Sequence, residues 1–407
     1  RSYSVTGVQT CALPIYGTTA GVWTTFSADQ VDLDFSEPAV LAEFIDILLF
    51  YAEKGARLIR LDAIAYLWKK DGTSCVHLPQ THAAVKAMRL ALEILGLDVK
   101  LLTETNVPHA ENMSYFGDGD EAHMVYNFSL PPLVLHAFVM EDASALSSWA
   151  TRLEVPPGGV LLNFLASHDG IGVTPAYGLV DDFSPVLKAV AERGGLVSYK
   201  ASPKGPVPYE LNISWADAVA PAGADCADRA SALLASYAVA FAMDGVPAVY
   251  FHSLVGSRSW MDGPTILGHN RAINRQRLAY DDLAAEVGKR ESMRGRVLEG
   301  FRRLIRARAG FTAFSPSSPR VAFPAQGPVF SLERGAGADA LLVAINCSGG
   351  SARFVLPAPW RGGAQLMDPL AGMEGEHGGR RLTVGESVDM PPYAVRWFLG
   401  ARHQDRS

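Results

Sequence analysis

The sequence predicts an α/β protein: a (β/α)₈ TIM barrel that lacks roughly its first three strands, followed by a C-terminal antiparallel β domain. Between residues 36 and 169, segments with helical spacing of apolar residues alternate with short apolar runs, as in parallel α/β folds. Three of these runs are closely followed by a carboxylate. After about residue 311 the composition changes to short apolar runs separated by Gly and Pro, which is typical of antiparallel sheets.

The first elements illustrate the alternation. Ser36 can cap a helix with Pro38 in its first turn, apolar residues follow at helical spacing, and Gly55 comes after its end. The run 56–61 then predicts a strand that ends at Asp62. In chain order we predict further helices and strands at 82–95 (helix), 99–102 (strand), 123–126 (strand), 143–153 (helix) and 160–165 (strand).

The stretch 170–221 interrupts this alternation. It is rich in Gly, Pro and Ser, so we predict a loop excursion that forms a lid or insert. Regular structure then resumes, with predicted elements at 227–243 (helix), 246–251 (strand), 296–307 (helix), 329–332, 340–345, 352–355 and 395–398 (strands). The predicted domains are therefore a partial catalytic barrel over 16–310 and a β domain over 311–407.

The first fifteen residues are excluded from this prediction. Residues 5–15, VTGVQTCALPI, read as the translation of a common sequencing adapter, although a genuine irregular N-terminus is the alternative. We therefore expect residues 1–15 to be an artefact and the true N-terminal part to be missing. A barrel without its first strands has open edges and an exposed apolar interior, so we expect the chain as given to be inactive.

Composition excludes several classes of protein. Hydrophobic residues make up 48% and charged residues 19%, as in a folded globular protein. The net charge of −6 argues against nucleic acid and against an anionic membrane surface as partners. The four cysteines show no metal-ligand spacing, so we expect no disulfide scaffold, no metal, no cofactor and a cytoplasmic location.

The three carboxylates after predicted strands are Asp62, Glu104 and Asp169. In a (β/α)₈ barrel the C-terminal ends of the strands form the catalytic rim. The 42 residues between the first two suit one strand–helix–strand unit, and the next 65 suit two further strands, so the three side chains are expected to converge. A single carboxylate at a strand end can instead be a helix cap or an ion-pair partner.

Three segments resemble signature regions of α-amylase superfamily glycosidases: RLDAIAY (60–66), LLTET (101–105) and NFLASHDG (163–170). The resemblance implies that Asp62 is the nucleophile, Glu104 the general acid/base and Asp169 the stabiliser of the transition state. It also implies that Arg60 supports the nucleophile and that His168 supports the glucose ring. Retaining glycoside transfer uses two carboxyl groups about 5–5.5 Å apart, one attacking the anomeric carbon and one protonating the leaving oxygen.

Further segments resemble the sucrose phosphorylase-type branch: 22–35, 72–83, 125–136, 245–257 and NRAINR at 270–275. Within that branch, ETNVPH at 104–109 is similar to glucosylglycerate phosphorylases, whereas sucrose phosphorylases usually carry His where this chain has Asn106. The implied reaction is reversible phosphorolysis of 2-O-α-glucosylglycerate to α-glucose 1-phosphate and glycerate, through a covalent glucosyl-Asp intermediate that inorganic phosphate captures.

The same resemblance implies four more substrate-binding residues. Tyr66 would border the glucose subsite, Arg271 would bind glucose hydroxyls, and Tyr209 with Glu210 would contact the acceptor. Three of them have a structural alternative: Tyr66 as a packed aromatic, Arg271 as a structural ion pair and Glu210 as a solvated loop charge.

Other functions remain open at this point. Sucrose phosphorylase, or a related α-glucosidase, is the first alternative, because acceptor chemistry is not determined by the three carboxylates. A non-catalytic relative is a remote alternative, since such relatives lose the carboxylates and this chain keeps all three.

Overall fold

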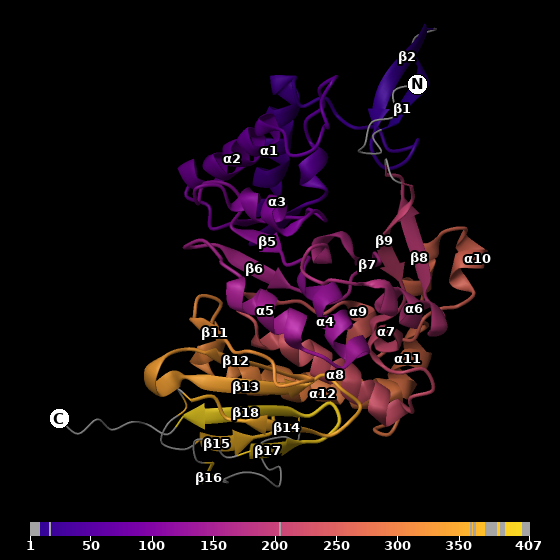
Figure 1. The fold of residues 1–407 in the computed structure, drawn as a ribbon. Helices are drawn as coiled ribbons and strands as arrows, with labels where there is room; N and C mark the ends of the chain where they lie inside the picture. Colours follow the sequence, from indigo (N-terminus) through magenta and orange to yellow (C-terminus); the bar gives the residue numbers. More distant parts are fainter. Residues whose placement is uncertain are drawn as a thin grey trace, which may run out of the picture. The chain divides into compact units, whose positions relative to one another are not determined.

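The structure is a computed structural model that describes residues 9–15, 18–202, 205–358, 360, 364–370, 381–382 and 387–400 (Figure 1). The chain divides into two compact units. The first unit comprises 1–126, 155–161 and 199–207, and the second comprises 127–154, 162–198 and 208–407.

The first unit contains three parallel strands, β3 (Leu58–Leu61), β4 (Lys100–Thr103) and β5 (Met124–Tyr126). The helices α1 (Pro38–Glu53) and α2 (Pro79–Ile94) connect to these strands and lie side by side. Both helices begin at a proline, which lacks an N–H that the first helical turn would leave unpaired. The helix–strand alternation predicted for this part of the chain is confirmed.

Two further parallel strands are β6 (Val160–Asn163) and β10 (Val246–Pro247). The strand order is β10-β6-β5-β4-β3, so β3, β4, β5 and β6 are neighbours both in the sheet and along the chain, whereas β7, β8 and β9 intervene between β6 and β10 along the chain. Parallel strands joined by helices in this order are the pattern of a (β/α) barrel. The major helices of the second unit are α4 (Leu130–Met140), α5 (Ser144–Arg152), α8 (Cys226–Ala242) and α12 (Met293–Ala309).

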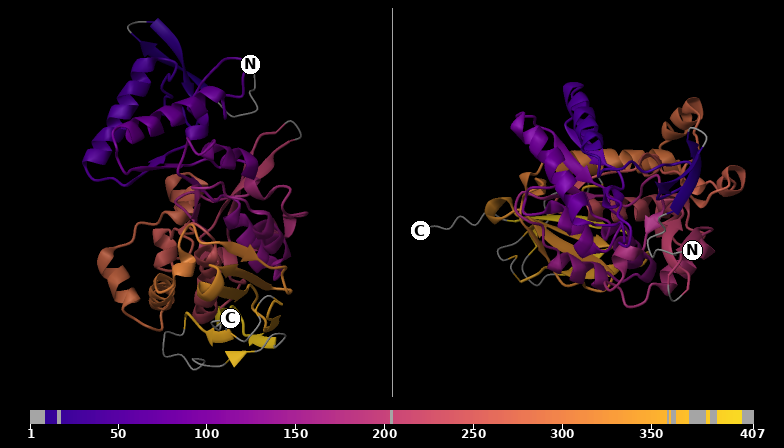
Figure 2. Two further views of the ribbon diagram at one scale, coloured as in Figure 1. Left: turned by 90° about the vertical axis from the view of Figure 1, so that its left-hand side faces the viewer. Right: turned by 90° about the horizontal axis from the view of Figure 1, so that it is seen from above.

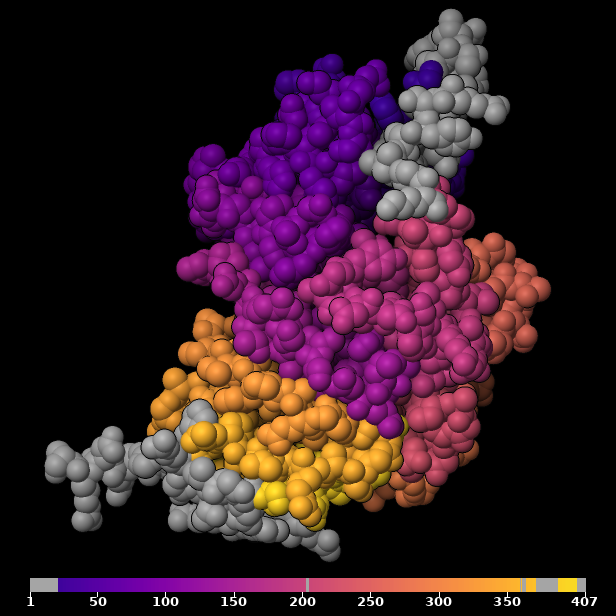
Figure 3. Space-filling view, in the orientation of Figure 1, coloured from indigo at the N-terminus to yellow at the C-terminus, as the bar shows by residue number. Residues whose placement is uncertain are grey.

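The C-terminal part forms antiparallel sheets, as predicted. The larger sheet contains β11 (Arg320–Ala322), β12 (Val329–Arg334), β13 (Leu341–Asn346), β18 (Val395–Gly400), β15 (Ala364–Met367) and β16 (Arg381–Leu382). A second sheet pairs β14 (Ala352–Val355) with β17 (Ser387–Met390). Leu342, Phe354, Met390 and Phe398 belong to one buried apolar cluster that joins the two sheets. Figure 2 shows these strands beside one another, coloured orange to yellow, and in Figure 3 the atoms of this part of the chain lie together on the surface in the same colours.

The stretch 170–221 is more regular than predicted. It contains β7 (Ile171–Gly172), α6 (Ser184–Glu192), β8 (Leu196–Lys200), β9 (Val207–Asn212) and α7 (Trp215–Val219). The three strands form a sheet of order β7-β9-β8. The prediction of a loop was wrong because composition reports turns, whereas pairing of Ile171 with Leu211 depends on residues forty positions apart.

Other elements also differ from the prediction, and two of them are instructive. The strand predicted at 246–251 covers only Val246–Pro247, and the helix α9 (Phe251–Leu254) begins where we expected the strand to end. The helix α4 was not predicted. Eight of its eleven residues are buried, so its sequence is apolar on every side and shows no helical periodicity.

The N-terminal segment expected to derive from an adapter lies partly outside the described residues, namely at 1–8. Gln9–Ile15 forms β1, which pairs with β2 (Thr18–Thr24) in antiparallel fashion. Among the described residues no helix is both long and apolar enough to cross a bilayer.

Candidate active site

Asp62 and Glu104 follow neighbouring strands of the first unit. Leu61 at the end of β3 is paired with Thr103 at the end of β4, so the next residue of each strand lies at the same edge of the sheet. The backbone N–H of Glu104 continues the ladder by donating to the carbonyl oxygen of Leu61 at 3.1 Å. The Asp62 side chain is 68% exposed and that of Glu104 only 16%. One carboxylate is therefore open to a ligand, and the other is enclosed.

Arg60 links the two carboxylates. One guanidinium nitrogen donates to Asp62 Oδ1, and the other lies 3.7 Å from Glu104 Oε2. The third nitrogen, Nε, donates to the Tyr126 hydroxyl at 3.1 Å. Burial alone would lower the pKa of Arg60, but the charges of Glu104, Tyr126 and Asp62 outweigh it and raise the pKa. A permanent cation therefore lies between both carboxylates.

The turn after Asp62 also contacts Glu104. Ala63 has a left-handed backbone conformation with φ 46°, and its N–H donates to Glu104 Oε2 at 2.9 Å. The short 3₁₀ helix η1 (Ile64–Tyr66) follows directly. Burial, and then the charge of Glu104, raises the pKa of Tyr66, so its phenol remains protonated and able to donate a hydrogen bond. The ring of Tyr66 packs edge-on against Phe26 with centroids 5.5 Å apart.

A second group of polar residues surrounds Asp169 in the second unit. Its Oδ1 lies 2.7 Å from a guanidinium nitrogen of Arg271 and accepts from Arg275 at 2.9 Å. Arg275 also donates through Nε to the carbonyl oxygen of His168 at 2.6 Å. The two arginines therefore fix the orientation of the Asp169 carboxylate, while the His168 ring is 56% exposed beside it.

Glu210 is buried, with 1% of its surface exposed. Arg271 donates to both of its oxygens, at 3.0 Å and 2.7 Å, in a bidentate ion pair. Burial would lower the pKa of Arg271, but the hydrogen bonds and charge of Glu210 and the charge of Asp169 raise it. Tyr209 hydrogen-bonds the same arginine. The alternative in which Glu210 is a solvated loop charge is wrong, because its carboxylate is enclosed and paired.

The predicted site residues thus fall into two groups, one in each unit. The first group is Arg60, Asp62, Tyr66 and Glu104, and the second is His168, Asp169, Tyr209, Glu210 and Arg271. Convergence of all three carboxylates around one substrate stays a prediction.

Sequence reasoning missed Tyr126 and Arg275. Tyr126 is the last residue of strand β5, and Arg275 is the last residue of the NRAINR segment. These positions are a weak sign in the sequence that either residue belongs to the site. Within the part of the chain that the structure describes, no three His, Cys, Asp or Glu side chains are arranged to hold a metal ion.

Comparisons with known proteins show what this chain is similar to. Residues 22–194 match the family described as "Alpha amylase, catalytic domain". A glucosylglycerate phosphorylase from Spirochaeta thermophila is 51% identical over 77% of this chain and 54% of its own length. A sucrose phosphorylase from Agrobacterium vitis is 29% identical over 73% of this chain and 59% of its own length. The chain therefore spans a little over half the length of these curated relatives.

The fold also resembles solved structures. The crystal structure of a sucrose 6F-phosphate phosphorylase from Thermoanaerobacter thermosaccharolyticum matches with a TM-score of 0.70 and 22% identity. The match covers 84% of this chain and 66% of that one. At this identity the likeness concerns the fold, which agrees with the predicted barrel and C-terminal β domain.

Proposed function

We infer that this chain, which carries an α-amylase-family domain, performs glucosyl transfer as part of a retaining α-glucosyl phosphorylase. The proposed reaction is reversible phosphorolysis of 2-O-α-glucosylglycerate to α-glucose 1-phosphate and glycerate. One observation carries the proposal: a single guanidinium, that of Arg60, contacts both Asp62 and Glu104 in a chain 51% identical to a glucosylglycerate phosphorylase.

In the first proposed step, Asp62 Oδ attacks the anomeric carbon while the bond from that carbon to the glycerate oxygen breaks. Glu104 donates its proton to the departing glycerate oxygen. The exposure of Asp62 supports its role as nucleophile, because a substrate must reach it directly. Ala63 and Arg60 hold Glu104 beside it, so both carboxyl groups are oriented before the substrate binds.

In the second proposed step, an oxygen of inorganic phosphate attacks the anomeric carbon of the glucosyl-Asp62 ester. Glu104, now a carboxylate, accepts the proton from that phosphate, and Asp62 is released. Two inversions give net retention of the α configuration. In this proposal Tyr66, Asp169 and His168 surround the glucose.

Three residues of the second group support recognition of the ligand. The Arg271 side chain is 40% exposed while it pairs with Glu210, and in this proposal it also binds a glucose hydroxyl. Tyr209 would contact the acceptor, whereas Glu210, whose side chain is only 2% exposed, would hold Arg271 in place. No metal or cofactor takes part in the proposed steps, and the three described cysteines (Cys75, Cys226 and Cys347) are free thiols, which supports a cytoplasmic location.

Sucrose phosphorylase is the second candidate. The identity of 51% to a glucosylglycerate phosphorylase, against 29% to a sucrose phosphorylase, favours glycerate as the acceptor. Both reactions share the covalent step, so they differ only in the group that Glu104 protonates.

Product analysis tests the proposal. The full-length protein that contains these residues is incubated with glucosylglycerate or sucrose, each with and without inorganic phosphate. We expect α-glucose 1-phosphate from glucosylglycerate only when phosphate is present. Glucose 1-phosphate formed preferentially from sucrose would support the second candidate, and free glucose formed without phosphate would indicate an α-glucosidase.

Two variants test the roles of the carboxylates. Asp62→Ala and Glu104→Gln should each lower kcat by about a thousandfold or more, because each removes a group that forms or breaks a bond. Asp71→Ala, at an exposed aspartate outside both groups, is the matched control. If Asp62→Ala retains the control's rate, the assignment of the nucleophile is wrong.

A further inference from the structure

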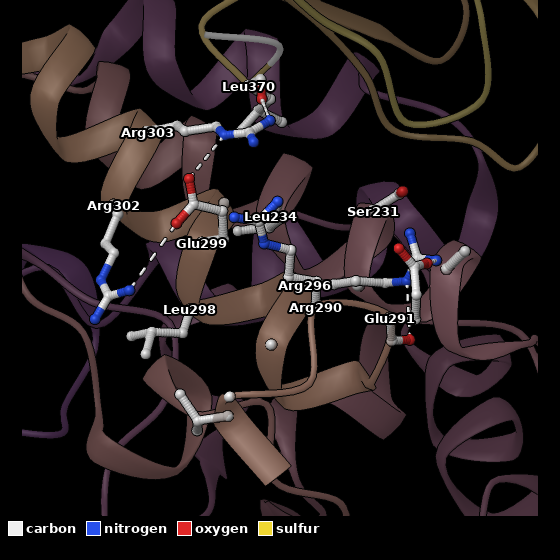
Figure 4. Close-up of a pocket in the computed structure, with 16 residues that line it drawn as sticks. Ser231, Leu234, Arg290, Glu291, Arg296, Leu298, Glu299, Arg302, Arg303 and Leu370 are labelled. Atoms are coloured by element: carbon white, nitrogen blue, oxygen red, sulfur yellow. Dashed lines mark hydrogen bonds and ion pairs between the residues drawn. The ribbon is translucent and has the colours of Figure 1, made fainter. Parts of the chain in front are cut away.

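A groove between α8 and α12 lies in the second unit, and none of the predicted site residues line it (Figure 4). Its volume is about 640 Å³. The end of α11 (Tyr280–Val287), the loop that follows it and Leu370 complete the walls. Pockets of about 300–1,000 Å³ are the size class that binds small molecules.

The floor of the groove is made of small residues. Gly300 of α12 lies directly over Leu234 of α8, where an added Cβ would come within 2.2 Å of the leucine Cδ1. Gly295 likewise lies close to the backbone of Lys289, because a Cβ added to Gly295 would lie 2.1 Å from the carbonyl oxygen of Lys289. Ala230 and Ser231 of α8 also line the groove and offer little bulk. The two helices therefore pack closely beneath an open space.

The rim is strongly charged. Arg290, Arg296, Arg302 and Arg303 line the groove together with Glu291 and Glu299, so positive charges outnumber negative ones by two although the whole chain has net charge −6. Figure 4 shows Glu299 between Arg302 and Arg303, and Glu291 paired with Arg296. Among the described residues Arg290 forms no ion pair, and its side chain is exposed.

The arginine side chains of this groove favour a ligand that carries a phosphate group. Guanidinium groups bind phosphate through paired, charge-assisted hydrogen bonds. The partial pairing of Arg302 and Arg303 with Glu299 holds these side chains at the rim while leaving them 58% and 43% exposed. A hydroxyl at Ser231 and a small apolar floor suit a ligand that also carries a sugar ring.

We propose that this groove binds a sugar phosphate at a site separate from the catalytic groups. The phosphate contacts Arg290 and its neighbouring arginines, and the sugar lies over Ser231 and the α8–α12 floor. Binding there uses none of the residues that carry the proposed function, so the two proposals can fail independently.

The test uses the full-length protein and glucose 6-phosphate as the probe, because its phosphate is not on the anomeric carbon. Isothermal titration at low ionic strength should give saturable binding with one site per chain. Arg290→Gln should weaken binding about tenfold or more, because Arg290 is the arginine of the groove that pairs with no carboxylate of the described residues. Ser231→Leu should also weaken it by filling the floor without changing charge.

Arg306→Gln is the matched control, since Arg306 is an exposed arginine on the same helix that does not line the groove. It should bind the probe as the unmodified protein does, and all three variants should keep the unmodified rate of phosphorolysis. Absence of binding by the unmodified protein, or unchanged binding by both Arg290→Gln and Ser231→Leu, would overturn the proposal. Inorganic phosphate that competes as tightly as the sugar phosphate would overturn the role of the sugar.

Discussion

The backbone N–H of Ala63 donates to Oε2 of Glu104 at 2.9 Å, although the two residues are 41 positions apart. Ala63 directly follows Asp62, so the turn that exposes one carboxylate also holds the other. Arg60 adds a second contact to Glu104 and also donates to Asp62. Strand β3 and its turn thus position both members of the proposed catalytic pair.

Arg60→Lys tests the importance of the shared guanidinium. A lysine ammonium is a compact point charge that cannot contact Asp62, Glu104 and Tyr126 through separate nitrogens as Arg60 does. We expect kcat to fall about a hundredfold while the protein remains folded. Steady-state kinetics and circular dichroism check this, with Tyr126→Phe as the control that removes only one of the three contacts. Equal losses in both variants would argue against a role for the charge.

The left-handed conformation of Ala63 predicts a contrast between two substitutions. Ala63→Val should lower the free energy of unfolding by about 1–3 kcal/mol, because a β-branched residue is strained at positive φ. Ala63→Gly should change it by less than about 1 kcal/mol, since glycine adopts this conformation without strain. Denaturant unfolding measures both values. Equal stability of the two variants would show that this backbone strain is unimportant.

Gly170 permits the close approach of the chain to Glu210. An added Cβ would lie 2.5 Å from Glu210 Cγ and 2.6 Å from the carbonyl oxygen of Leu211, which is backbone and cannot easily move. Gly170→Ala should therefore destabilise the protein by about 1–3 kcal/mol. It should also lower activity, because Glu210 pairs with Arg271 beside Asp169.

The control for this prediction is Gly350→Ala, where the nearest atom to an added Cβ is 4.0 Å away. Its free energy of unfolding, measured by denaturant, should stay within about 0.5 kcal/mol of the unmodified protein. A Gly170→Ala variant as stable as this control would contradict the proposed crowding.

His123 predicts a loss of stability in acid. Burial, and then the charges of Arg89 and Lys100, lowers the pKa of His123 to about 4 from 6.5. Its Nδ1 accepts a hydrogen bond from the N–H of Leu101 at 3.1 Å, which requires an unprotonated nitrogen. Because the folded pKa is below the unfolded one, this stabilisation is complete above about pH 6.5 and is lost as pH falls towards 4.

The variant His123→Asn isolates that contribution, since an amide oxygen accepts a hydrogen bond without titrating in this range. The free energy of unfolding should fall less steeply between pH 6.5 and 4 in the variant than in the unmodified protein. A nuclear magnetic resonance titration of the His123 ring gives an independent readout. Titration of the ring near pH 6.5 in the folded protein would contradict the prediction.

Much of the first group of site residues could be predicted from the sequence. The alternation of helix and strand patterns placed Asp62 and Glu104 after consecutive parallel strands, and consecutive parallel strands end at the same edge of a sheet. The composition after residue 311 likewise predicted the antiparallel sheets. These signals are local, because periodicity and turn residues act within a few positions of the chain.

Only the tertiary structure decided the rest. The burial of Glu210 against Arg271, 61 positions away, the contact of Arg275 with Asp169, 106 positions away, and the sheet formed by β7, β8 and β9 all depend on segments meeting after the chain folds. The helix α4 could not be recognised because burial on all sides removes the periodicity that marks a surface helix. The sequence by itself therefore determined which carboxylates follow which strands. Folding decided which cations meet them, since an ion pair depends on distance in space rather than on separation along the chain.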